Sequence, residues 1–148
     1  MESSAERLDR NTIELLNELR VAGTGIQVMF AFLLIVPFNN GWRHVDSFER
    51  TVYFVTLLIV AAAAFLILAP PVQHRILFRR GEKGFLIRVG NDLALAGMLM
   101  LALGFIGILV LLSDVVVGGA APLIVGALAA VFVGGLWFAW PIGRRDEE

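Results

Sequence analysis

Apolar residues are concentrated in four long runs that contain no charged side chain. The runs cover residues 21–42, 51–73, 93–113 and 115–143. A helix needs roughly 20 apolar residues to cross a hydrocarbon core about 30 Å thick. The runs are continuously apolar, whereas the strands of a membrane β-barrel alternate between apolar and polar positions. The pattern therefore predicts four transmembrane helices, at about residues 21–40, 51–72, 93–113 and 120–141.

The segment before the first run has a different pattern. Within residues 5–20, Leu8, Thr12, Leu15 and Leu19 recur at helical spacing among charged residues, which predicts an amphipathic helix. This helix either extends the first span into the cytoplasm or docks a partner or sister subunit. The predicted fold is all-α, a single membrane domain over residues 1–148. It is a transmembrane four-helix bundle with a short N-terminal cytoplasmic amphipathic helix at 1–20.

Basic residues lie mainly on one side of the predicted membrane. With the amino terminus inside, ten of the 12 Lys and Arg residues fall in inner segments, and only Arg43 and Arg50 fall outside. Segments that face the cytoplasm carry an excess of Lys and Arg. Both termini are therefore predicted to be cytoplasmic.

The most basic stretch is the inner loop expected between the second and third spans, residues 74–92. Basic and apolar side chains are interleaved there, a composition suited to the surface of an anionic membrane. We expect contacts with anionic lipid headgroups from Arg75, Arg79, Arg80, Lys83 and Arg88. The simpler alternative is that these charges only set the topology.

Composition narrows the possible chemistry. Hydrophobic residues make up 58% of the chain and charged residues 17%, against about 45–50% and 25% in soluble domains. Cysteine is absent, which excludes disulfides and a thiol nucleophile. No nucleophile–base pair, nucleotide fingerprint or metal motif is present, so we expect no enzyme activity, no metal and no cofactor. The net charge of −1 provides no field to attract nucleic acid.

Several segments resemble those of a known family. They are ELRVAGTGIQ at residues 18–27, FAFLL at 30–34, RTVY at 50–53 and HRILFRR at 74–80. Together they resemble a family of small bacterial four-span membrane proteins of unknown function, some of which carry a sodium/proton-antiporter label. The resemblance implies the bacterial cytoplasmic (inner) membrane and supplies no catalytic residues. An antiporter of this kind normally needs an ionisable group within the membrane, and the interiors of the four runs contain none.

Gln27 is the most informative polar residue. It lies seven positions after Arg20, about 10 Å along a helix, which places its amide within the hydrocarbon region. Thr24 lies one turn earlier on the same face. An amide at that depth needs a hydrogen-bond partner. The two alternatives are an interhelical hydrogen bond and a position along a polar pathway.

Small residues predict where helices approach each other closely. Gly97 and Gly104 share one face of the third span. Gly126, Ala130 and Gly134 recur every four residues in the fourth. Such faces allow close packing of helices in lipid, either within one bundle or between subunits.

Two classes of function are compatible with these features. One is a small channel or transporter component built from several copies, because four short helices rarely enclose a pathway alone. The other is a non-catalytic structural or accessory membrane module of a larger complex. Expected partners are membrane lipids and copies of the chain or other membrane proteins.

Single cysteines would test the predicted topology, because the natural chain has none. Cysteine in place of Asp46 or Gly118 should react with a membrane-impermeant thiol reagent in whole cells. Cysteine in place of Glu82 or Asp146 should react only after permeabilisation. The opposite pattern would contradict the argument from charge.

Overall fold

Helices make up nearly all of the part of the chain that the structure, a computed structural model, describes: residues 4–76 and 83–143. The elements in chain order are α1 (Ser4–Ile35), the 3₁₀ helices η1 (Val36–Phe38) and η2 (Asn40–His44), α2 (Ser47–Ile76), α3 (Lys83–Val116), α4 (Ala121–Val133), the π-helix η3 (Gly134–Ala139) and α5 (Trp140–Gly143). Among these described residues, four segments are long and apolar enough to cross a membrane: Glu6–Phe38, Ser47–Ile76, Ile87–Val116 and Ala121–Ala139. The predicted all-α, four-helix fold is confirmed.

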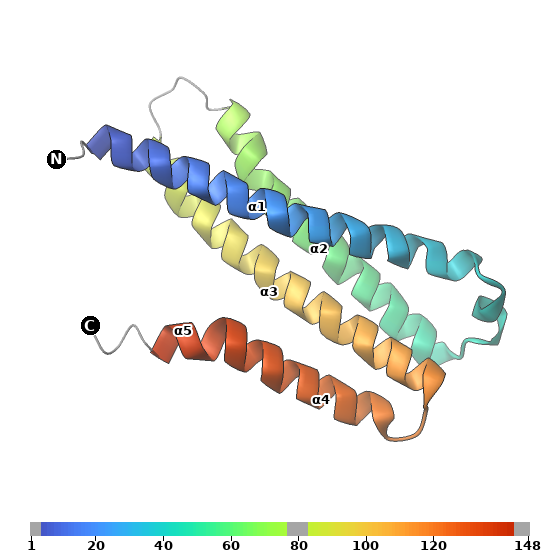
Figure 1. The fold of residues 1–148 in the computed structure, drawn as a ribbon. Coiled ribbons are helices and arrows are strands. Elements are labelled where there is room, and N and C mark those ends of the chain that lie inside the picture. The colour runs from blue at the N-terminus through green and yellow to red at the C-terminus, as the bar shows by residue number, and fades with distance from the viewer. Residues whose placement is uncertain (1–3, 77–82, 144–148) are drawn as a thin grey trace.

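Three of the helices form the centre of the molecule and the fourth lies at its side. Helices α1, α2 and α3 contact one another, whereas α4 contacts α3 alone among them (Figure 1). Helix α1 begins and α5 ends at the same end of the bundle. We call this the basic end because Arg20, Arg75 and Arg88 lie towards it. The opposite end, with η1, η2 and residues 117–120, is the turn end.

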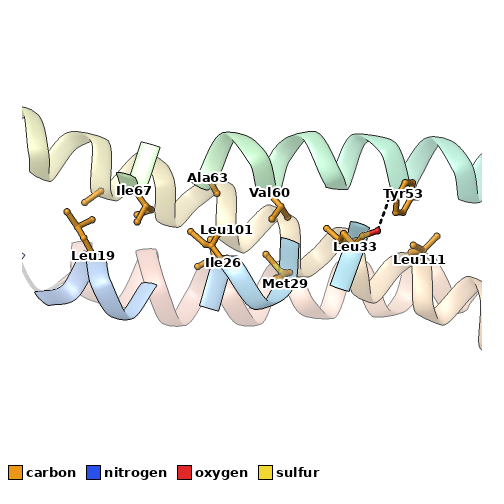
Figure 2. Packing of buried hydrophobic residues seen from close by; sticks show 11 residues of the cluster. Leu19, Ile26, Met29, Leu33, Tyr53, Val60, Ala63, Ile67, Leu101 and Leu111 are labelled. Carbon is orange, nitrogen blue, oxygen red and sulfur yellow. Dashed lines mark hydrogen bonds between the residues drawn. The ribbon is translucent and has the colours of Figure 1, made fainter. Parts of the chain in front are cut away.

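Buried residues follow a repeat of alternating three and four residues along the three central helices. On α2 they are Tyr53, Thr56, Val60, Ala63, Ile67 and Pro70. Helix α1 contributes Leu19, Ile26, Met29 and Leu33, and α3 contributes Ala94, Leu101 and Leu111 (Figure 2). A repeat of this kind keeps one seam of each helix facing its neighbours, as in a coiled coil. The core is therefore continuous along all three helices.

Glycines on α3 bring it very close to α2. A Cβ atom at Gly97 would lie 2.7 Å from Ile67 Cγ1, and one at Gly104 would lie 2.7 Å from Val60 Cγ2. At Gly107 it would collide with the side chain of Thr56. Only glycine permits this separation of the two helices, and the large side chains of α2 fill the space that the glycines leave.

Polar contacts stabilise the turn end. The hydroxyl of Tyr53 donates a hydrogen bond of 2.8 Å to the carbonyl oxygen of Leu33, joining α2 to α1. This oxygen lacks its usual helical partner, because residue 37 is proline and has no N–H. The ring of Trp42 packs edge-on against Tyr53, with centroids 4.8 Å apart.

A reciprocal pair of hydrogen bonds begins α2. The Glu49 N–H donates to Asp46 Oδ1 and the Asp46 N–H donates to Glu49 Oε2, both at 2.8 Å. This arrangement is a capping box, which satisfies backbone donors that a helix otherwise leaves free at its first turn. The start of α2 is therefore fixed next to the Tyr53 contact.

Helix α4 is peripheral. Only 6% of its spanning window is buried, against 28% for α2 and α3. It follows a turn in which Gly118 and Gly119 have φ of 70° and 62°, a backbone conformation that favours glycine. Pro122 then occupies its first turn.

The predicted amphipathic helix and inner loop can be compared with the structure. The helix expected at residues 5–20 is the first half of α1, which agrees with the alternative that it extends the first span, and no proline interrupts the chain before residue 37. Helices occupy most of the segment expected as an inner loop at residues 74–92, because α2 continues to Ile76 and α3 begins at Lys83. A 32-residue helix is about 48 Å long, so α1 extends well beyond a 30 Å hydrocarbon layer.

Gly107→Ala should destabilise the bundle. Its added methyl group would lie 3.1 Å from Thr56 Cβ and 3.0 Å from Thr56 Cγ2, inside a buried contact. Overpacking of this kind costs about 1–3 kcal/mol, which outweighs the roughly 1 kcal/mol by which alanine is preferred over glycine in a helix. Thermal unfolding in detergent measures the change.

Gly135→Ala is the matched control, because a Cβ atom there has nothing within 4 Å. It should leave the unfolding temperature unchanged or raise it. Equal stability of the two variants would contradict the close approach of α2 and α3.

Candidate functional site

A groove between α1 and α2 gathers the polar side chains that lie within the apolar part of α1. Its volume is about 430 Å³. Its lining residues are Leu16, Leu19, Arg20, Gly23, Thr24 and Gln27 on α1, and Ile67, Leu68 and Pro71 on α2. The groove lies on the outside of the three-helix core, towards the basic end.

Gln27 and Thr24 are brought together on this surface. The Thr24 hydroxyl donates to the carbonyl oxygen of Arg20 in its own helix, at 3.0 Å. The Gln27 side chain is exposed, and its amide makes no hydrogen bond to any residue of the described segments 4–76 and 83–143. The described residues of this bundle therefore supply no interhelical hydrogen bond to Gln27, and both alternatives for this residue stay predictions.

Two arginines flank the basic end of the groove. Arg20 lies on its α1 wall and is exposed. Arg75 is also exposed and follows Leu68 and Pro71 on α2 by seven and four residues, so it lies on the same face of that helix. Among the residues that the structure describes, neither guanidinium group is paired with a carboxylate.

The predicted lipid-contacting residues are spread over two helices. Arg75 lies in the last turn of α2, and Arg88 is exposed on α3. Lys83 is the first residue of α3, and nothing is described of its side chain. Arg79 and Arg80 lie outside the described residues. Contact with anionic lipid stays a prediction.

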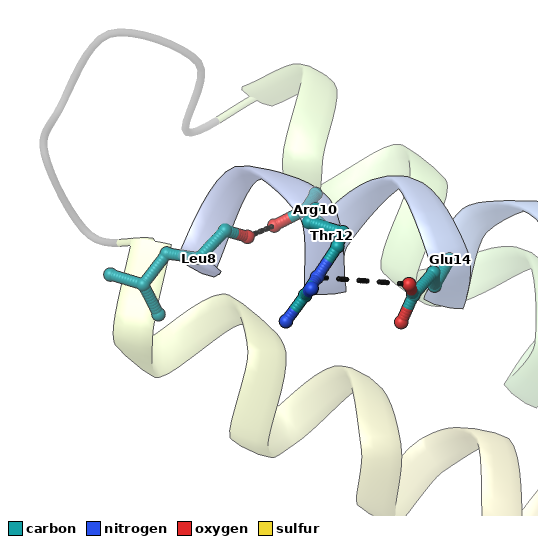
Figure 3. A network of polar contacts seen from close by, with 4 residues as sticks. All are labelled: Leu8, Arg10, Thr12 and Glu14. Carbon is teal, nitrogen blue, oxygen red and sulfur yellow. Dashed lines mark hydrogen bonds and ion pairs between the residues drawn. The ribbon is translucent and has the colours of Figure 1, made fainter. Parts of the chain in front are cut away.

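The first turns of α1 carry polar contacts of their own, apart from the residues that line the groove. The Thr12 hydroxyl donates to the Leu8 carbonyl oxygen at 2.8 Å, and Arg10 Nε lies 3.9 Å from Glu14 Oε1 (Figure 3). These contacts stay within α1 and support a continuous helix before the membrane.

The predicted small-residue faces have different surroundings. Gly97 and Gly104 face α2. Gly126 faces α3, where an added Cβ would lie 2.8 Å from Val110 Cγ2. Ala130 is exposed, and an added Cβ at Gly134 would have nothing within 4 Å. The face of α4 thus packs on α3 at its beginning and is free further along.

Two other polar features lie outside this groove. An open cavity of about 610 Å³ at the turn end includes Asp46 and Asp114, but Asp46 is already engaged in the capping box. Among the described residues, no group of three or more His, Asp or Glu side chains could hold a metal ion. Gln73 Oε1 on α2 is buried without a hydrogen-bond partner within the described chain. The sequence offered no signal for Gln73, because it is the last residue of an apolar run.

Comparison with known proteins gives a family and no activity. The family of unknown function DUF6328 matches residues 1–141. This chain belongs to that family. No curated protein and no solved structure matches it. The resemblance to a four-span membrane family of unknown function is thereby confirmed, and the site must be interpreted from its own chemistry.

Gln27→Leu should not reduce the stability of this DUF6328 chain in lipid-free detergent, because the amide has no partner in the bundle. Tyr53→Phe is the matched comparison, since it removes one real interhelical hydrogen bond. Such bonds in membranes average about 0.6 kcal/mol and reach about 1.7 kcal/mol. Thermal unfolding should therefore show a loss for Tyr53→Phe alone. A larger loss for Gln27→Leu would mean that its amide is bonded within the bundle.

Proposed function

We propose that this DUF6328 protein is a non-catalytic structural or accessory module of a membrane complex. The closed three-helix core is the observation that supports this function best. Val60 and Ala63 have no exposed surface, and Ile26, Leu33 and Ile67 have 1%. A chain with an apolar and filled centre is suited to holding a fixed shape in the membrane.

The peripheral position of α4 supports assembly with other helices. Most of its surface is free of intramolecular contacts, and Leu123, Val131 and Phe132 are 80%, 75% and 68% exposed. In a bilayer, such a surface is covered by lipid or by apolar helices of a partner. The resemblance to a bacterial family is the reason for proposing the bacterial cytoplasmic membrane. Ten of the 12 basic residues favour an orientation with both termini inside.

A channel or transporter component built from several copies is the second candidate. The exposure of Thr24 and Gln27 on α1 favours it, because a ring of chains would place these polar groups around a shared axis. Nothing ionisable is available in the interior of the spans to carry a proton. A pathway of this kind would therefore depend on amide, hydroxyl and backbone groups.

Ion flux in liposomes that contain only the purified chain separates the two candidates. For a structural or accessory module, flux of sodium, potassium and protons should equal that of empty liposomes. Native mass spectrometry of the protein purified from its own membrane in mild detergent should then reveal other membrane proteins bound to it. Flux above background that Gln27→Leu abolishes and Gly135→Ala preserves would favour the channel instead.

A further inference from the structure

We infer that the groove between α1 and α2 binds one anionic phospholipid, with the phosphate at Arg20 and an ester carbonyl group at Gln27. This site goes beyond the proposed function. It rests on the insertion of the helices in a bilayer. It is compatible with a structural or accessory module, whereas a channel with Thr24 and Gln27 around a shared axis would need the same face of α1. Three features point to this ligand: the order of chemical groups along the groove, the charge at its basic end and the unsatisfied amide of Gln27.

Three kinds of surface follow one another along the groove. Arg20 provides a cation at the basic end, and Thr24 and Gln27 provide polar groups one and two turns further towards the turn end. Apolar side chains, including Leu19, Ile67 and Leu68, form the rest of the lining. A phospholipid presents matching groups in the same order: an anionic phosphate, polar esters and then an acyl chain.

The depth of Gln27 fits the ester region of a lipid. Side chains on a helix lean towards its amino terminus, which is the basic end for α1. Both Arg20 and Gln27 therefore reach towards the nearer membrane surface, and the Gln27 amide lies close to the level of Thr24. An amide left without a hydrogen bond in an apolar medium is costly, and an ester carbonyl is an acceptor that a lipid supplies there.

The charge at the basic end selects an anionic headgroup. Arg20 and Arg75 stand on the two helices that flank the groove, and neither is paired with a carboxylate within the described segments. A guanidinium group binds phosphate through paired hydrogen bonds. The headgroup of a zwitterionic lipid carries a positive group beside its phosphate, which would lie near these arginines. A lipid with net negative charge carries no such group.

A second copy of the chain fits this surface less well. Two copies inserted in the same orientation and meeting at α1 around a two-fold axis would place Arg20 beside its own counterpart, and like charges repel. A free phosphate ion would satisfy Arg20 but would leave the apolar lining and the Gln27 amide uncovered. A phospholipid covers all three parts of the groove.

Lipid binding to the delipidated, full-length protein in mild detergent tests this site. Native mass spectrometry during titration with dioleoyl phosphatidylglycerol or dioleoyl phosphatidylcholine gives the affinity of the first bound lipid. Phosphatidylglycerol should bind at least five-fold more tightly. Arg20→Gln should weaken its binding about five-fold, the usual weight of one basic residue at an anionic surface, and should reduce the preference over phosphatidylcholine.

Two further variants examine the body of the groove. Gly23→Leu should fill it, because an added Cβ at Gly23 meets only Ile67 Cγ2, at 4.0 Å, and the rest of the side chain then occupies the lipid's place. This variant should weaken the binding of both lipids at least five-fold. Gln27→Leu should weaken the binding of both lipids to the same extent, because both carry ester groups. The substitution removes no contact on which folding depends.

Arg43→Gln is the matched control for charge. It removes one exposed arginine, which lies in η2 at the turn end and not among the lining residues of the groove, and it should change the affinity less than two-fold. Equal binding of the two lipids, an equal loss for Arg43→Gln and Arg20→Gln, or displacement of phosphatidylglycerol by inorganic phosphate would each overturn the site. So would unchanged lipid affinity in both Gly23→Leu and Gln27→Leu. None of these outcomes depends on ion flux, so the proposed function stands or falls separately.

Discussion

The close approach of α2 and α3 is the contact on which the rest of the structure depends. Gly97, Gly104 and Gly107 present bare backbone to Ile67, Val60 and Thr56, and these large side chains fill the space between the helices. Helices in lipid associate through packing rather than through the exclusion of water, so small residues at the contact are decisive. Helix α3 is also the one central helix that touches α4. Its position therefore fixes both the core and the peripheral helix.

A core filled in this way leaves few places for polar groups within the spans. Thr56 is buried where α2 meets Gly107, and Tyr53 donates a hydrogen bond to the backbone of Leu33. Thr24 and Gln27 lie instead on the outer surface, where a ligand can reach them. In a bilayer, the outer surface of a helix bundle meets lipids and the helices of other proteins. The proposed structural module and the proposed lipid site therefore both depend on this surface.

The four spans and the all-α fold could be predicted from sequence, because long uncharged runs have few alternatives in a chain this apolar. The extension of α1 before the first span was one of two alternatives predicted from the sequence. The sequence did not predict that α3 begins at Lys83, since charged residues such as Arg88 are equally common in loops. The sequence also did not show which way the Gln27 side chain faces. Its depth follows from its distance to Arg20, but its face depends on the repeat that buries Ile26 and Met29 beside it. That repeat becomes clear only when α2 and α3 are in place.

Solvent access to the centre of the bundle tests the account most directly. Ala63 has no exposed surface and lies at the middle of the buried repeat on α2, and cysteine differs from alanine there by one sulfur atom. In proteoliposomes, Ala63→Cys should remain unreactive towards a small water-soluble thiol reagent until the protein is unfolded. Reaction in the folded protein, at a rate close to that of a cysteine placed at exposed Gly41, would show that water reaches the core and would contradict the closed bundle.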